Sequence, residues 1–372
     1  MSGVDNSPRA ATVEIGGVPV GDLPRSLRRR AAELRLAATR PRRSAAKLAV
    51  IVAVAVGAGA LAVVLDNPLM WAVYAVVAGI VLTSLFAVEH EALHTSLFGH
   101  PFADHVVGTL CGVVCLTPYA AYRPFHFEHH IRTHVEGDPE PIVVVRGHLS
   151  HLGMVAFGVL GLAAMLWAQL LSMLVGRGPA FARRSRRHAL EWTSLVAGLA
   201  LPVACVVTGL FAGWRLPLLL WAAPLAVFLP LAGFVSTTEH YGCEYGPAPA
   251  VRTSRTVRTN AAARWLLWNA NFHTAHHVLP GVPAHNLATL HELIEPDCEY
   301  VADSYVGWHL QMARRIRAGD YVDPPPWDGS DEPADLSDAG RDDRMSTSTS
   351  RMGSTGTSRR SMDPVAQSKN SG

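Results

Sequence analysis

Long apolar runs separated by short polar segments dominate the hydropathy pattern of this chain. Uncharged stretches extend from Leu48 to Leu65 and from Leu69 to Val88, with the turn residues Asp66, Asn67 and Pro68 between them. Each stretch approaches the roughly 20 residues that an α-helix needs to cross the hydrocarbon of a bilayer. The pattern therefore predicts a helical hairpin in a membrane.

Three further apolar runs cover residues 149–175, 192–212 and 216–235. The loop after the first of them is basic, and the positive-inside rule places such a loop in the cytoplasm. The chain also returns to the cytoplasm after the first hairpin, so we expect residues 149–175 to lie in the membrane without crossing it. This leaves four transmembrane helices, with both termini in the cytoplasm.

The two ends of the chain differ in composition from its apolar middle. Residues 1–44 are rich in arginine, and residues 321–372 change to proline, acidic residues and Ser/Thr repeats that cannot bury enough apolar surface to fold. We expect a partly disordered cytoplasmic tail at 1–44, a membrane domain at 45–320 and a disordered tail at 321–372. Residues 102–122 contain charge and glycine, and are expected to form a surface or half-buried element.

The composition supports a multi-pass integral membrane protein, and we expect a plasma membrane of bacterial type. Only 17% of residues are charged and 49% are hydrophobic, whereas soluble domains carry about 25% charge. A net charge of +2 argues against a nucleic-acid partner. The five cysteines form no CxxC pair, which argues against a zinc ribbon or a disulfide scaffold. The 18 histidines remain to be explained.

Most histidines near the apolar runs fall into groups with helical spacing. Residues three or four apart share one face of a helix, so each group can direct its imidazoles toward one metal site. Nine candidate ligands exceed the capacity of one ion and predict two metal ions, and imidazole suits iron as well as zinc. The candidates are His90 and His94; His126, His129 and His130; His273, His276 and His277; and His240 at the end of the last run.

One segment also fits a different enzyme class. His90-Glu91-Ala92-Leu93-His94 matches the HExxH pattern of zinc proteases, in which the glutamate is the general base. A membrane zinc protease is therefore a remote alternative, because it would use two of the nine histidines and leave both HxxHH groups without a task.

The three boxes, HxxxH, HxxHH and HxxHH between paired spans, closely resemble the membrane fatty acid desaturase superfamily, which includes hydroxylases and carotenoid ketolases. The resemblance covers roughly residues 48–300 and is densest at 126–140 and 255–291. It implies an all-α integral membrane fold whose cytoplasmic helical cap holds a di-iron centre, with the nine histidines as iron ligands. Some relatives carry an asparagine one turn before the histidine that matches His240, and this chain has Ser236 there.

The resemblance also implies the chemistry. Two external electrons would reduce the irons to the ferrous state, and O2 would oxidise them to a form that desaturates an aliphatic chain; we favour a fatty acyl lipid as substrate. A hydroxylase, a ketolase or a desaturase of a small natural product is the alternative. Because the sequence shows no haem, iron–sulfur or dinucleotide motif, we expect an external donor such as ferredoxin with its reductase. The residues expected around the ligands are Glu91, Glu128, Glu239, His134 and Asn269.

Overall fold

Five long apolar helices form the frame of the protein. The computed structural model describes residues 25–140, 147–184 and 188–320. Within these residues, five helices are long and apolar enough to cross a membrane. They are α2 (Pro41–Leu65), α3 (Pro68–Leu93), α6 (His148–Leu174), α8 (His188–Ala212), and α9 (Arg215–Pro217) continuing through the π-helix η1 (Leu218–Ala222) into α10 (Ala223–His240). The predicted apolar runs are therefore all helical.

The turn between α2 and α3 is set by its own residues. Asp66 adopts a left-handed conformation and ends α2, and the Asn67 side chain accepts a hydrogen bond from the backbone N–H of Met70, 3.0 Å away. Pro68 occupies the first position of α3, where its missing N–H is not needed. These signals start the second helix immediately after the first.

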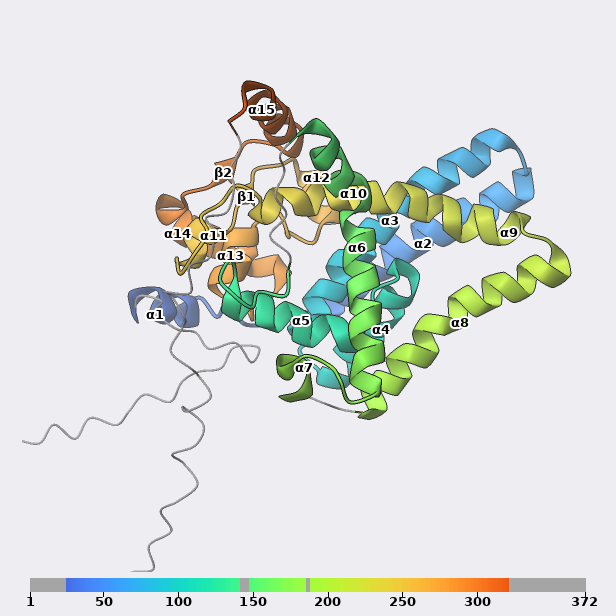
Figure 1. The fold of residues 1–372 in the computed structure, drawn as a ribbon, viewed down its shortest axis with the longest axis horizontal. Coiled ribbons are helices and arrows are strands. Elements are labelled where there is room, and N and C mark those ends of the chain that lie inside the picture. The colour runs from blue at the N-terminus through green and yellow to red at the C-terminus, as the bar shows by residue number, and fades with distance from the viewer. Residues whose placement is uncertain (1–24, 141–146, 185–187, 321–372) are drawn as a thin grey trace, which may run out of the picture. The chain divides into compact units, whose positions relative to one another are not determined.

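An ion pair places two turns at the same end of the bundle. Arg215, which begins α9, pairs with Asp66 in the α2–α3 turn. α3 and α10 therefore both run from this end toward the histidines, which lie at their opposite ends. In Figure 1, α2, α3, α8 and α9 extend toward this end of the bundle, on the right of the view.

Both ends of α6 lie near the histidine-bearing helices. Gly233, in the last part of α10, packs directly against the carbonyl of Val155 near the start of α6. Toward the other end, Gln169 donates to the carbonyl oxygen of Ala121 in α5, 2.9 Å away, and α7, which follows α6, packs against α5. In Figure 1, α6 crosses α10 at a steep angle. By length and composition α6 could cross a membrane as the other four helices could, so its non-crossing path stays a prediction.

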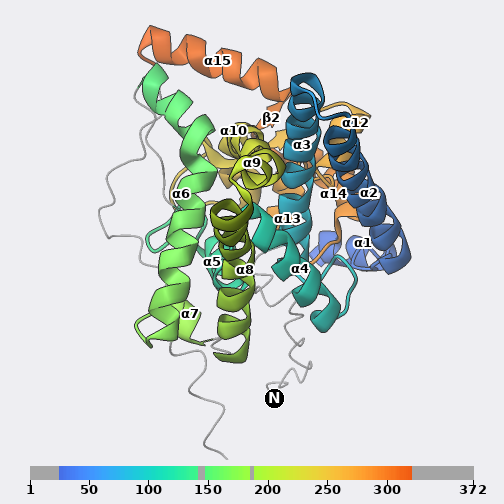
Figure 2. The same cartoon turned by 90° about the vertical axis from the view of Figure 1, so that its right-hand side faces the viewer.

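Shorter elements form the part of the chain around the histidines. α4 and α5 are bent by 100° against each other, so residues 101–132 form a broken, half-buried element rather than a straight span. Figure 2 shows α4 and α5 beside α3 and α13. These elements are α1 (Arg25–Glu33), α4 (Pro101–Cys115), α5 (Tyr119–Arg132), α7 (Ala180–Arg184), α11 (Ala250–Thr253), α12 (Ala261–Leu266), α13 (His273–Val278), η2 (Ala284–Asn286), α14 (Leu287–Ile294), η3 (Glu295–Asp297) and α15 (Tyr305–Ala318).

The described residues contain one very small sheet. β1 (Thr256–Val257) pairs in parallel with β2 (Val301–Ala302). The pair ties the segment after α11 to the segment before α15, on either side of the third histidine box. The rest of the described fold is helical or irregular, as an all-α integral membrane fold requires.

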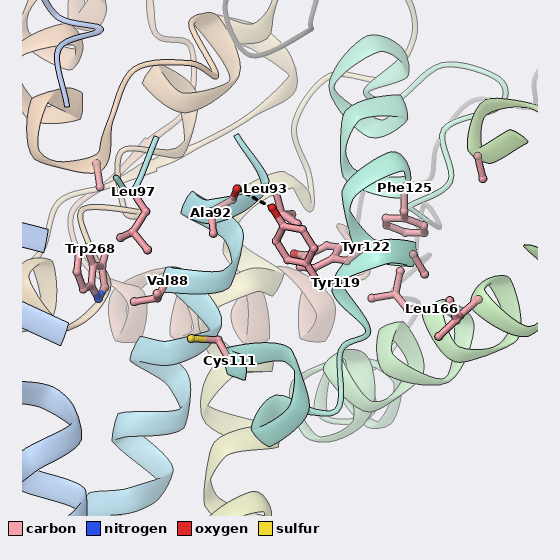
Figure 3. Close-up of a cluster of buried hydrophobic side chains, with 14 of the residues drawn as sticks. Val88, Ala92, Leu93, Leu97, Cys111, Tyr119, Tyr122, Phe125, Leu166 and Trp268 are labelled. Atoms are coloured by element: carbon pink, nitrogen blue, oxygen red, sulfur yellow. Dashed lines mark hydrogen bonds between the residues drawn. The ribbon is translucent and has the colours of Figure 1, made fainter. Parts of the chain in front are cut away.

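A buried cluster joins α3 to the helices that surround it. Val88, Ala92 and Leu93 are each 0% exposed and pack against aromatic residues of α5. Figure 3 shows the Tyr119 hydroxyl donating to the carbonyl oxygen of Ala92, a bond of 2.8 Å. Because this packing lies within one helical turn of His90 and His94, it fixes the first histidine box on a rigid helix end.

Part of the expected N-terminal tail is packed against the domain. Leu36 is buried with Phe272, Leu279 and Leu290, next to the third histidine box. The Asn286 side chain donates to the carbonyl oxygen of Leu36, 2.7 Å away. The segment from Arg25 to residue 44 is therefore helical over much of its length and partly packed against the domain. The predicted boundary at residue 44 stays a prediction. The tail predicted at 321–372 lies outside the described residues.

Candidate metal centre

Four separate elements bring the nine predicted histidines together. His90 lies in the last turn of α3 and His94 caps it, whereas His240 is the last residue of α10. The remaining six lie on α5 and α13, at the helical spacing seen in the sequence. Those six are His126, His129 and His130 on α5, and His273, His276 and His277 on α13.

The first cluster joins α3, α5 and α13. Ligand atoms of His90, His94, His126 and His276 all lie within 4.8 Å of one another. His130 belongs to the same group, because its Nε2 lies 2.9 Å from Nε2 of His126. Five imidazoles therefore surround the first position.

The second cluster joins α5, α10 and α13. Ligand atoms of His129, His240 and His277 lie within 4.8 Å of one another. Nε2 of His273 lies 2.8 Å from Nε2 of His240 and adds a fourth imidazole. The division into five and four nitrogens agrees with the prediction of two metal ions.

The surroundings of His240 fit a bound cation. Its Nδ1 donates to the carbonyl oxygen of Thr253, 2.9 Å away, so a neutral ring presents a lone pair at Nε2. That lone pair faces Nε2 atoms of His129 at 3.2 Å and His277 at 3.1 Å, in addition to His273. One lone pair cannot serve three neighbouring rings as hydrogen-bond acceptor, whereas a metal ion can accept donation from all of them.

The third box is held in the form that binds metal. Burial is the main cause that lowers the pKa of His273, His276 and His277 well below the usual value, and repulsion between neighbouring imidazoles adds to it. Neutral imidazole is the ligand form. Nε2 of His276 is also buried without a hydrogen-bond partner among the described residues, which is costly unless an ion occupies the site.

Asp138 is a site residue whose role the sequence did not reveal. Its Oδ1 accepts a hydrogen bond from Nδ1 of His129 at 2.9 Å, and its Oδ2 accepts from the backbone N–H of His134, also at 2.9 Å. The carboxylate thereby orients the His129 ring and holds the turn after α5. The only sequence signal was its place in Asp138-Pro139-Glu140, directly after the second box.

Three of the residues expected around the ligands contact other parts of the site. Oε1 of Glu239 lies beside the His273 ring, 3.7 Å from its Nδ1, beyond hydrogen-bond distance. His134 lies beyond the end of α5, and its Nδ1 donates to the carbonyl oxygen of Glu244, 2.6 Å away. Asn269 donates from its side chain to the carbonyl oxygen of Ala284, 2.9 Å away. These contacts join the boxes to neighbouring loops.

The other two glutamates bond elsewhere. Glu128 pairs with Arg132 at 2.7 Å. Oε1 of Glu91 accepts the backbone N–H of Ala284 at 2.8 Å, which ties α3 to the loop after the third box. A carboxylate used in this way is poorly placed as the general base that a zinc protease of the HExxH type needs.

A cavity of about 590 Å³ extends to both clusters. It lies between α6, α10, α3 and α5, and its wall is largely apolar, with Phe86, Phe157 and Met165 among its residues. His90 and His126 of the first cluster line it, and so do His129, His240 and His273 of the second. An apolar molecule in this cavity would therefore reach the candidate metal positions.

The family model "Fatty acid desaturase" matches residues 67–308, which contain all three boxes and His240. The chain belongs to the fatty acid desaturase family. This finding confirms the resemblance seen in the histidine boxes and removes the support for a zinc protease.

Individual desaturases resemble the chain at modest identity. It is 22% identical over 273 residues to the chloroplastic omega-6 fatty acid desaturase of Glycine max, a match that covers 65% of this chain and 60% of that enzyme. It is 24% identical to the fatty acid desaturase of Bacillus subtilis, over 59% of this chain and 67% of the relative. It is 29% identical to the sphingolipid delta(4)-desaturase of Drosophila melanogaster, over 69% and 81%. The chain thus spans less than two thirds of the soybean enzyme.

Proposed function

We propose that this protein is a membrane di-iron desaturase that introduces a double bond into the aliphatic chain of a fatty acyl lipid, using O2 and two external electrons. The observation that carries this proposal is the apolar cavity of about 590 Å³ that reaches both histidine clusters. Pockets of this size suit ligands of lipid or drug size. Family membership supports the reaction class.

The cavity wall gives the protein its part in substrate positioning. Phe86, Phe157 and Met165 can hold a hydrocarbon chain by dispersion and exclude water from the reacting carbon. Three glycines of α6 enlarge the cavity, because nothing lies within 4 Å of where their Cβ atoms would be: Gly153, Gly158 and Gly161. The hydrocarbon chain of the substrate would therefore lie against α6.

The histidines supply the chemistry through the metal that they hold. Iron ions bound by the two clusters would supply the oxidising power that an unactivated C–H bond requires, which no side chain can provide. The nine ligands are His90, His94, His126, His129, His130, His240, His273, His276 and His277. Burial favours the neutral ligand form of the third box. The protein orients His129 through Asp138 and His240 through the Thr253 carbonyl.

The location and partners complete the proposal. We place the histidine side of the membrane in the cytoplasm of a bacterial-type cell, with ferredoxin and its reductase as the external electron donor. The arginine-rich loop and N-terminal segment would contact anionic lipid on that side. Five helices able to span a bilayer support the membrane location.

A hydroxylase is a second candidate, and Ser236 is the observation in its favour. This residue lines the cavity one turn before His240, at the position where some relatives carry asparagine. The change alters the polar surface of the cavity beside the second cluster. The mass spectrometry described below separates hydroxylation from desaturation.

Two measurements test the proposed function. Metal analysis of the purified protein should find about two iron ions per chain. Mass spectrometry of lipids from cells with and without the gene should show an acyl chain that loses two hydrogens with desaturation, or gains one oxygen atom with hydroxylation. One zinc ion without iron, or unchanged acyl lipids under oxygen, would contradict the proposal.

A further inference from the structure

A second, smaller cavity lies next to the backbone segment that carries His240. Its volume is about 180 Å³, and it shares no lining residue with the large cavity. The residues that decide its chemistry are Arg255, Glu299, Tyr300, Trp308, Gln311 and Arg315. Two arginines and one glutamate line this cavity, in contrast to the largely apolar wall of the large one.

Arg255 is the deepest charged group of this cavity. The residue is only 6% exposed, and its Nη1 donates to the carbonyl oxygens of Thr238 and Tyr241, at 2.7 and 2.8 Å. Its guanidinium carbon lies 5.5 Å from the ring centre of Tyr300 and 5.2 Å from that of Trp308. The guanidinium therefore lies between two backbone carbonyl oxygens and two aromatic rings.

Three of the five N–H groups of the Arg255 guanidinium have no acceptor among the described residues. The described residues offer no carboxylate to its guanidinium, and no acceptor bonds to Nε or Nη2. A buried cation without a counter-ion is costly, and a guanidinium edge matches the two oxygens of a phosphate or carboxylate. The remaining N–H groups can reach a ligand in the cavity that Arg255 lines.

We propose that this cavity is an oxyanion site, which binds the phosphate or carboxylate group of a small molecule or of a lipid headgroup. Arg255 contacts the anion from inside, while Gln311 and Arg315 of α15 lie at the rim, where Arg315 also pairs with Asp320 at 3.1 Å. This site is separate from the metal clusters, so the proposal holds whatever reaction the enzyme catalyses.

The position of the site gives the anion a structural consequence. Arg255 bonds to the carbonyl oxygens of Thr238 and Tyr241, and its own backbone N–H donates to the carbonyl oxygen of Glu239, 2.8 Å away. These bonds enclose His240 on both sides. An anion that immobilises Arg255 therefore stiffens the segment that presents His240 to the second cluster.

The first test titrates the full-length protein in neutral detergent with inorganic phosphate, followed by calorimetry. We expect saturable binding that Arg315→Glu weakens about tenfold and that Glu299→Gln strengthens, because a negative group leaves the rim. Arg314→Glu is the matched control, since it makes the same charge change on the same helix outside the cavity. Arg255→Lys, which removes the two-point contact, should weaken binding if its melting temperature stays near that of the unaltered protein.

The second test identifies the source of the anion. Protein in phosphatidylcholine nanodiscs is compared with protein in nanodiscs that also contain phosphatidylglycerol, with the gain in melting temperature as the readout. A gain with phosphatidylglycerol that Arg315→Glu abolishes supports a lipid headgroup; a gain with free phosphate alone supports a soluble anion. Equal effects of Arg314→Glu and Arg315→Glu, or no saturable binding of either anion, would overturn the proposal.

Discussion

Nδ1 of His129 lies 2.9 Å from Oδ1 of Asp138, while Nε2 of the same ring lies 3.2 Å from Nε2 of His240. The carboxylate therefore holds one side of the ring and leaves the other directed into the second cluster. Such a contact fixes the ring orientation and strengthens the ligand. A loop residue nine positions after His129 thus takes part in the site.

Replacing Asp138 should weaken the second cluster without removing a ligand. In Asp138→Asn the charge is lost, and we expect metal affinity to fall about 10- to 100-fold. Iron retained per chain during titration with a chelator measures this change. Glu128→Gln is the control, because Glu128 pairs with Arg132 and with no histidine among its described contacts. Equal iron retention in Asp138→Asn and the unaltered protein would refute the role of Asp138.

Removing one imidazole of the first cluster should abolish turnover. His276→Ala and His130→Ala each take a buried nitrogen from this cluster, so we expect iron to fall from about two ions per chain to about one or fewer. His188→Ala is the control, because His188 is 60% exposed at the start of α8. Normal turnover in His276→Ala would show that the ligand assignment is wrong.

His309 is a less neutral control than His188, because it bonds to two other helices. Its Nε2 donates to the carbonyl oxygen of Phe234, and its Nδ1 lies 2.8 Å from Nε2 of His151. His309→Ala would therefore loosen the contact of α15 with α6 and α10. We still expect turnover in this variant, with a lower melting temperature.

The histidine sites could be predicted from the sequence because their spacing is local. His126, His129 and His130 share a face of α5 through helix geometry alone. Asp138 and the Thr253 carbonyl could not be predicted, since their contacts depend on how distant segments pack. The same holds for the cavity, which needs α6 to lie across α10.

Residues 261–271 contain neither glycine nor proline and would fit one continuous helix by composition, but the helix observed there is shorter. α12 ends at Leu266, and Trp268 and Asn269 adopt positive φ angles of 52° and 56°. Tertiary contacts favour this turn: the Trp268 indole donates to the Ser84 hydroxyl at 3.1 Å, and the Asn269 amide donates to the Ala284 carbonyl. These bonds outweigh local helix propensity, which is worth less than about 1 kcal/mol per residue.

Filling the cavity should impair substrate binding while leaving the metal in place. Gly158 lines the cavity and has open space around its missing Cβ, so Gly158→Leu would occupy room that the substrate chain needs. We expect turnover of long acyl chains to fall by about 10²-fold, with unchanged iron content. Gly57→Leu is the matched control, because Gly57 is exposed on α2 with similar open space. Full activity in Gly158→Leu would place the substrate elsewhere.

The path of α6 predicts which residues share a side of the membrane. The test uses single cysteines in a background where the partly accessible Cys205 and Cys298 are replaced by serine. Leu69→Cys and Trp214→Cys flank the two turns that the Asp66–Arg215 pair joins, so an impermeant maleimide should label both in intact cells.

His148→Cys and His188→Cys place the label at the first residues of α6 and α8, respectively. Because α6 begins and ends beside α10 and α5, both cysteines should react only after the membrane is opened. A crossing α6 would instead expose one of them to the outside and protect the other. The labelling pattern of these two positions therefore decides between four and five crossings, and it also shows whether the histidine clusters face the cytoplasm, where a soluble electron donor could reach them.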